Sequence, residues 1–300
     1  MFRTRSHTQI NITRNPITAI RRAIPGLLFI VPGFAGFILF YLWPFVISVG
    51  YSFLNRPVGG EFVGFQNYLD LFSNPAYRLG LRNTIIFIGL SVPINIALSL
   101  WVAMMINKTT KYKPLFILIF LIPLVIPSGS MVFFWRQMFA FDGFLNGLLY
   151  NVGLDSINWL NSNYARLTLL IIFVWKNLGF NMVLFIAGLS NIPREYYEAA
   201  YIDGAGSFTI LKRITLPCLI PTFILTFLMS IINSFRVFRE VYLLMGSHPH
   251  ESVYMLQHFM NNNFFALNYP RLSTATTLLA IALTILTLFF FKLERKVLHD

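Results

Sequence analysis

One lysine, Lys176, lies near the middle of a long apolar run over residues 167–192. An ionisable residue inside a run of membrane-spanning length indicates a functional site. Trp175, Asn177 and Asn181 accompany it, and the two asparagines, four residues apart, share one face of a helix. Amide groups beside an aromatic ring suit a hydroxyl-rich solute. The alternative is that Lys176 reaches the outer membrane interface or bonds to a neighbouring helix.

A second candidate set, Arg236 and Arg239 with Glu240, follows a later apolar run. We predict that Arg236 and Arg239 contribute to the same solute pathway as the Lys176 cluster. Three histidines come after them in the chain: His248, His250 and His258. They stand in a loop context without evident partners to orient them, so we predict no metal site.

The residues that catalysis would need are missing. An intramembrane enzyme requires paired catalytic groups, whereas Asp142 and Asp155 both fall in a segment between apolar runs. The chain also has no phosphate-cradling G-x-x-x-x-G-K-[ST] pattern, since no Gly-Lys pair occurs in it. We therefore predict no catalytic residues and no ATP hydrolysis by this chain.

The most particular spacing lies in a polar segment over residues 193–213. It reads Glu198-Ala199-Ala200-Tyr201-Ile202-Asp203-Gly204, followed nine residues later by Ile214-Thr215-Leu216-Pro217. Pro193 suits a first helical turn, and Gly204 can adopt the left-handed conformation that ends a helix. Ser207 is a candidate N-cap for a second helix. The pattern predicts a projecting helix–turn–helix; the alternative is a helix pair lying on the lipid headgroups.

These residues must be positioned by membrane helices. The chain has 300 residues, of which 56% are hydrophobic and 11% charged, against roughly a quarter charged in soluble domains. Several charge-free runs are long enough to cross the hydrocarbon layer as helices. We predict an all-α integral membrane protein with one domain over 24–300, after a basic tail over 1–23. Its six spans are expected at about 24–53, 83–107, 114–138, 167–192, 214–238 and 272–291.

The formal charge of +12 is distributed unevenly between the loops. Of the 23 basic residues, 14 fall in the tail, after the even-numbered spans and in the 193–213 segment. Because Lys and Arg favour cytoplasmic loops, both termini and this segment are predicted to be cytoplasmic. The basic surplus is thus a topology signal, and no nucleic-acid partner is expected.

The polar segment resembles the signature loop of the permease subunits of binding-protein-dependent ABC importers. Its matching residues are Glu198, Ala199, Ala200, Gly204, Ile214, Leu216 and Pro217. Further motifs are similar to those of the sugar-importer branch of this family. Within that branch they resemble the first-type membrane subunit, which pairs with a second, different permease. They are Pro25-Gly26-Leu27-Leu28-Phe29, Tyr41-Leu42-Trp43-Pro44, Tyr51-Ser52-Phe53, Phe65-Gln66-Asn67-Tyr68, Arg82-Asn83-Thr84, Trp175 to Met182, Leu189 to Glu195, and Phe235-Arg236-Val237-Phe238.

The resemblance implies a multi-pass permease in the cell membrane of a prokaryote. Its partners would be a second permease subunit, a cytoplasmic ABC ATPase dimer and an extracytoplasmic solute-binding protein. Residues 193–213 would dock in the ATPase, with Glu198, Asp203 and Gly204 among the coupling residues. The chain itself would bind no cofactor, because ATP and Mg²⁺ are used by the ATPase.

The resemblance weakens toward the outer half of the predicted pathway. The position of Arg239 is commonly acidic in the sugar branch, and the following loop here reads Gly246-Ser247-His248-Pro249-His250-Glu251. A sugar or oligosaccharide is the expected solute, with a polyol, a phosphorylated polyol or a modified saccharide as the alternative. A stand-alone secondary transporter is a further alternative, which leaves the polar segment unexplained.

Overall fold

The computed structural model describes residues 26, 29–108 and 112–299, and the regular secondary structure of this part of the chain is helical, with loops between the helices and one isolated bridge between Leu54 and Phe62. The predicted basic tail over 1–23 and the beginning of the first predicted span lie outside the described residues. The helices that follow are η1 (Ile38–Leu42), α2 (Trp43–Tyr51), α3 (Gln66–Ser73), α4 (Pro75–Asn107), α5 (Lys113–Val125), α6 (Ser128–Phe139), α7 (Phe144–Asn151), α8 (Ala165–Ser190), α9 (Arg194–Ile202), α10 (Ser207–Ile210), η2 (Leu211–Thr215), α11 (Leu216–Cys218), α12 (Ile220–Arg236), α13 (Phe238–Met245), η3 (Glu251–Val253), α14 (Leu256–Phe265) and α15 (Tyr269–His299). The predicted all-α class is confirmed for the described residues.

Five helical segments of the described chain are long and apolar enough to cross a membrane. They are Phe29–Tyr51, Pro75–Asn107, Ala165–Ser190, Ile220–Met245 and Tyr269–Leu293. A sixth candidate is the pair Lys113–Val125 and Ser128–Asn151, whose two parts are bent by 95°. By length and composition, the described residues therefore contain five candidate spans, or six if the bent pair is counted as one.

The bend in this pair interrupts the single span expected over 114–138. Helix α5 ends at Val125, and Ile126 takes an extended conformation with φ −69° and ψ 126°. Pro127 follows, and a proline disfavours the helical conformation for the residue before it. Pro127 also lacks an N–H to continue the hydrogen-bond ladder. The chain therefore changes direction before α6 begins.

Two other spans have shifted ends. Helix α4 begins at Pro75 rather than 83, because Asn74 accepts a hydrogen bond from the Tyr77 N–H at 3.1 Å and Pro75 suits the first helical position. The fifth span was expected over 214–238, but its long helix begins at Ile220 and the apolar segment continues to Met245.

Helices α4 and α8 form the most extensive packing pair, with α5 against α8 and α12 against both. The largest core cluster joins residues such as Val92 of α4, Phe185 of α8 and Ile231 of α12. Close approach depends on a small residue at one point: a Cβ on Gly179 of α8 would lie 1.8 Å from the Phe120 carbonyl oxygen of α5. Small residues commonly let membrane helices approach in this way.

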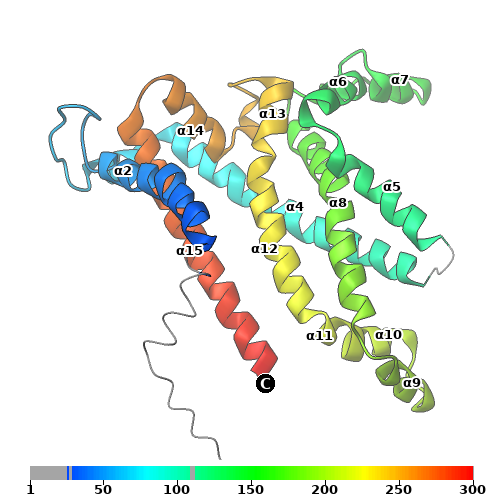
Figure 1. Cartoon of the computed structure of the whole chain (residues 1–300). Helices are drawn as coiled ribbons and strands as arrows, with labels where there is room; N and C mark the ends of the chain where they lie inside the picture. Colours follow the sequence, from blue (N-terminus) through cyan, green and yellow to red (C-terminus); the bar gives the residue numbers. More distant parts are fainter. Residues whose placement is uncertain (1–25, 27–28, 109–111, 300) are drawn as a thin grey trace, which may run out of the picture.

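Figure 1 shows how the remaining elements are distributed. Helices α9 and α10 lie at the same end of the molecule as the C-terminal end of α15. Helices α6, α7, α13 and α14 lie at the opposite end. The long helices α8 and α12 run between the two ends, so they connect the end that holds α9 and α10 to the end that holds α6, α7, α13 and α14.

Candidate functional site

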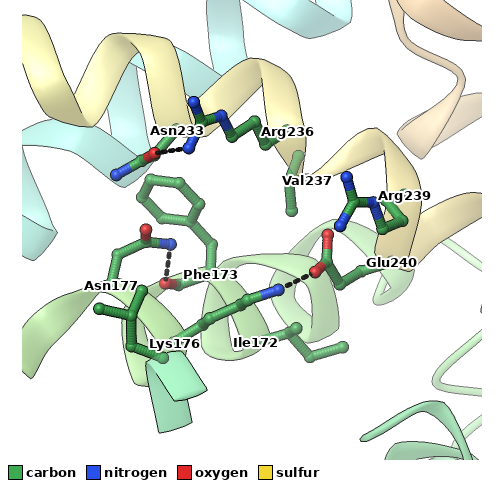
Figure 2. A pocket seen from close by; sticks show the side chains of 10 residues that line it. Ile172, Phe173, Lys176, Asn177, Asn233, Arg236, Val237, Arg239 and Glu240 are labelled. Carbon is green, nitrogen blue, oxygen red and sulfur yellow. Dashed lines mark hydrogen bonds and ion pairs between the residues drawn. The ribbon is translucent and has the colours of Figure 1, made fainter. Parts of the chain in front are cut away.

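A cavity of about 390 Å³ lies where α8 faces the junction between α12 and α13. Its polar lining comprises three basic side chains, one carboxylate and two amides. The lining residues are Lys176, Arg236, Arg239, Glu240, Asn177, Asn233, Leu124, Ile172, Phe173 and Val237. Figure 2 shows Lys176 and Asn177 entering from α8, with Arg236 and Arg239 on the α12–α13 side. The cavity therefore combines charged groups and amides from helices that are distant in sequence.

Lys176 forms an ion pair with Glu240, and Ser128 completes a three-residue network. The Lys176 Nζ donates to the Ser128 Oγ at 2.8 Å, and the Ser128 Oγ donates to the Glu240 Oε1 at 2.9 Å. The Glu240 side chain is only 6% exposed and that of Lys176 is 26% exposed. A buried charge requires such partners to offset its lost hydration. The network thus joins α8, α6 and α13 beside the cavity.

The two arginines differ from Lys176 because neither is paired with an acid. The Arg236 Nη1 donates to the Asn233 Oδ1 at 3.4 Å, and Arg239 has no hydrogen bond or ion pair with any described residue. Both arginines are exposed in this chain. Lys176 and Glu240 form the only ion pair within the described part of the molecule. The cavity therefore carries two uncompensated positive charges.

The other two predicted pathway residues lie away from the cavity. Trp175 packs edge-on against Trp135, with 5.2 Å between the ring centroids. Asn181 is fully buried, and its Nδ2 donates to the Ser230 Oγ of α12 at 2.8 Å. Asn177 lines the cavity, while its Nδ2 donates to the Phe173 carbonyl oxygen at 2.9 Å. The structure thus brings together Lys176, Asn177, Arg236 and Arg239, but not Trp175 or Asn181.

The sequence did not point to Ser128 or Asn233 as members of this site. A serine after a proline and an asparagine in an apolar helix are both common in membrane helices that need only packing. Their roles depend on Lys176 and Arg236 being nearby, and Ser128 is 48 residues from Lys176 in sequence. Glu240 was named in the sequence only together with Arg236 and Arg239. Its pairing with Lys176 could not be predicted, because the two residues are 64 positions apart.

The histidines lie apart from this cavity. His258 of α14 is fully buried, and burial together with the positive charge that His248 can carry lowers its pKa to about 4. Its Nδ1 accepts a hydrogen bond from the Met255 N–H at 3.1 Å. Among the described residues, no group of three His, Cys, Asp or Glu side chains is arranged to hold a metal ion.

The polar segment forms a second candidate site at the other end of the molecule. Helix α9 ends in a paired hydrogen-bond motif: the Ala205 N–H donates to the Ala200 carbonyl at 2.9 Å and the Gly204 N–H to the Tyr201 carbonyl at 3.1 Å. Gly204 has φ +72°, the left-handed conformation that this motif requires. Helix α10 begins three residues later at Ser207. Residues 203–206 therefore make a tight turn between two short helices.

The two short helices carry exposed apolar side chains, and Tyr201 and Phe208 among them line a cavity of about 590 Å³ together with the C-terminal end of α4. Ile202 is 87% exposed, Phe208 75% and Tyr201 65%, and Glu198 and Ala199 are also exposed. Exposed aromatic and aliphatic anchors beside a small residue are typical of surfaces that bind another protein.

The opposite face of the segment is tied to the membrane helices. Ala200 and Ile210 are buried, and Tyr197 and Leu216 pack against the main core cluster. The Tyr197 hydroxyl also hydrogen-bonds with the Thr215 Oγ1 at 3.2 Å. The two faces together give a segment that is open to a partner and attached to the core.

This arrangement is that of a helical membrane protein with several candidate spans, a charged cavity and a polar segment at one end of the molecule. Residues 83–298 match the family described as "Binding-protein-dependent transport system inner membrane component". The chain belongs to this family, and its predicted resemblance to importer permeases is confirmed. The chain is thus a transport component rather than an enzyme.

Curated relatives and solved structures agree with this assignment. The lactose transport system permease protein LacF of Rhizobium radiobacter is 33% identical, over 73% of this chain and 75% of the relative. The trehalose/maltose transport system permease protein MalF of Thermococcus litoralis is 30% identical, over 92% and 95%. The crystal structure of a bacterial ABC transporter that imports the acidic polysaccharide alginate has a similar fold, with a TM-score of 0.82 at 21% identity, over 94% of this chain and 99% of that chain.

Proposed function

We propose that this chain is the membrane-spanning permease subunit of an ATP-driven importer for a sugar or oligosaccharide. It forms half of the translocation pathway and couples that half to a separate cytoplasmic ATPase. The observation that carries the proposal is the exposed turn after Gly204, held on the membrane core of a chain in this permease family.

The names of the relatives support a saccharide as the solute. The LacF and MalF relatives carry lactose and trehalose/maltose in their names, and a further relative that is 34% identical is an arabinooligosaccharides transport system permease protein AraP of Bacillus subtilis. A cavity with amide groups and a volume of about 390 Å³ is suitable for a small polar solute.

The proposed topology has six spans, with the bent pair of α5 and α6–α7 counted as one. An even number of spans places both termini on one side of the membrane, and the basic loops favour the cytoplasm. Residues 24–300 then form one membrane domain in the cytoplasmic membrane of a prokaryote. The α9–α10 turn faces the cytoplasm, where an ATPase is available.

The partners follow from the family and from what this chain lacks. The partners that we assign to this chain are a second permease subunit, an ABC ATPase dimer and an extracytoplasmic solute-binding protein. Within the permease pair, this chain is the first-type subunit. ATP and Mg²⁺ are bound by the ATPase, because this sequence has no phosphate-binding loop.

Coupling would pass from the α9–α10 turn through rigid helices to the cavity. Glu198, Ala199 and Gly204 face the ATPase, whereas Ala200 and Ile210 anchor the segment in the permease. Helix α8 ends at Ser190, so Lys176 lies roughly 20 Å along the same helix from the polar segment. A movement of the docked turn therefore shifts α8 and α12, which supply the charged groups of the cavity.

Within the pathway, we assign solute contact to Lys176, Asn177, Arg236 and Arg239, which line the cavity. Trp175 and Asn181 support the geometry of α8 instead, through their contacts with Trp135 and Ser230.

The test is uptake of labelled lactose, maltose, trehalose and arabinooligosaccharide by cells whose importer contains Glu198→Lys or Gly204→Val. Loss of a central interface residue costs about 2 kcal/mol or more, so uptake should fall by about thirtyfold or more at an unchanged membrane level of the protein. Gly206→Ala is the matched control, because Gly206 has an ordinary φ and open space around it. Unchanged uptake in both variants would contradict the coupling role.

A further inference from the structure

We propose that the cavity selects a saccharide bearing an anionic group, such as a carboxylate, phosphate or sulfonate, and that Arg236 and Arg239 recognise this group. The inference rests on the proposed function and adds the charge of the solute to it.

The lining of the cavity has an excess of positive charge. Three of its lining residues are basic and one is acidic. The acid, Glu240, is already engaged by Lys176 and by Ser128, and it is almost completely buried. Its charge is therefore directed at Lys176 and is not shared with the arginines through any contact within 4 Å. The part of the cavity that a solute can reach is thus positive.

The two arginines lie in a segment where lipid does not solvate charge. Both fall inside the apolar segment Ile220–Met245, which is long enough to cross the membrane. Charged residues in such segments face a water-filled cavity or a partner, because lipid does not solvate them. Arg236 has only the Asn233 amide at 3.4 Å, and Arg239 has no partner among the described residues. Two guanidinium groups therefore remain available for a ligand.

The guanidinium groups of Arg236 and Arg239 are suited to binding an anion. Guanidinium presents its donors in a planar fork that binds two oxygens of a carboxylate or phosphate at once. Arg236 ends α12, and Arg239 lies in the first turn of α13, three residues further on, so both border the same cavity. Asn177 and Asn233 stand beside them and can bond to sugar hydroxyls. The lining thus has one part for an anionic group and another for a polyhydroxyl ring.

The test uses matched pairs of probes with the complete importer in nanodiscs. The pairs are galacturonate with galactose, and glucose 6-phosphate with glucose, with the dissociation constant of each measured by isothermal titration. We expect the charged member of at least one pair to bind about tenfold tighter, and this preference to weaken as salt screens the interaction. Arg236→Gln and Arg239→Gln should each reduce the preference by about tenfold.

Arg82→Gln is the matched control, since Arg82 is an exposed arginine that does not line the cavity. It should leave the preference unchanged. Equal binding of charged and neutral probes, or a preference that survives in the double variant, would overturn the inference. If uptake still depends on Glu198 in that case, the proposed function stands and only the anion selectivity fails.

Two other roles for the arginines give different results. If they pair with acids of the second permease subunit, the glutamine variants dissociate the permease pair on size exclusion without changing the probe preference. If they bind lipid phosphate, adding phosphatidylglycerol to phosphatidylcholine nanodiscs abolishes binding of the charged probes. Either result contradicts recognition of an anionic solute.

Discussion

Glu240 is held by donors from two other helices, and this small network is the structural centre of the cavity wall. Ser128 is the first residue of α6, directly after the bend at Pro127, and Glu240 lies in the first turn of α13, directly after α12 ends. Lys176 of α8 bonds to both. One lysine therefore connects two helices that each begin at a break in a predicted span.

This connection predicts the effect of removing Lys176 alone. Lys176→Met leaves a buried carboxylate with only the Ser128 hydroxyl, so the free energy of unfolding should fall by about 3 kcal/mol. Glu240→Met added to it removes the unpaired charge and should recover most of that loss. The measurement is a double-mutant cycle of thermal unfolding in detergent. Losses that simply add in the double variant would show that the pair is not coupled.

At the scale of residues, the charged side chains of the cavity could be predicted from the sequence, but the residues that they contact could not. Lys176, Arg236 and Arg239 are noticeable in sequence because charge is rare in apolar runs, and all three line the cavity. The choice of Asn177 over Asn181 depends on which turn of α8 faces the cavity. Spacing puts both on one face of the helix, but Asn181 is one turn further along and meets Ser230 of α12.

At the scale of elements, the spans follow from apolar length, whereas the breaks depend on local chemistry. Pro127 could have indicated the end of α5, yet Pro93 lies inside α4, which continues without interruption to Asn107. A proline in an apolar run thus bends one helix and is tolerated in another, because neighbouring helices decide whether the freed carbonyl can be satisfied. The sequence alone does not distinguish these cases.

The packing of α5 on α8 makes a prediction of its own. Gly179→Ala places a methyl group 1.8 Å from the Phe120 carbonyl oxygen, so α5 must move away from α8. Overpacking of this kind costs about 1–3 kcal/mol, and the variant should unfold at a lower temperature in detergent. Gly89→Ala of α4 is the matched control, because a Cβ there has open space. Equal stability of the two variants would contradict the close approach of α5 and α8.

For the whole molecule, the cavity lies beside the middle of α8 and the C-terminal end of α12, whereas the polar segment follows the C-terminal end of α8 and precedes α12. This separation is consistent with the proposed function, in which the ATPase binds the polar segment and the solute binds in the cavity. The polar segment is held in place on one face, where Ala200 and Ile210 are buried, and Gly204 adopts the left-handed conformation at its turn. The turn at Gly204 depends on neighbouring residues and can be predicted from a local pattern, whereas the cavity is assembled from four helices that are distant in sequence.

The most direct test of the account is photo-crosslinking from the exposed turn in membranes that contain the complete importer. A photoreactive amino acid replaces Ile202, which is 87% exposed beside Gly204, or Val58, which is 85% exposed in the loop after α2. We predict that the probe at Ile202 captures a protein whose peptides, by mass spectrometry, include an ATP-binding G-x-x-x-x-G-K-[ST] motif, and that the probe at Val58 does not. Capture of lipid alone at Ile202, or capture of the ATPase from Val58, would contradict it.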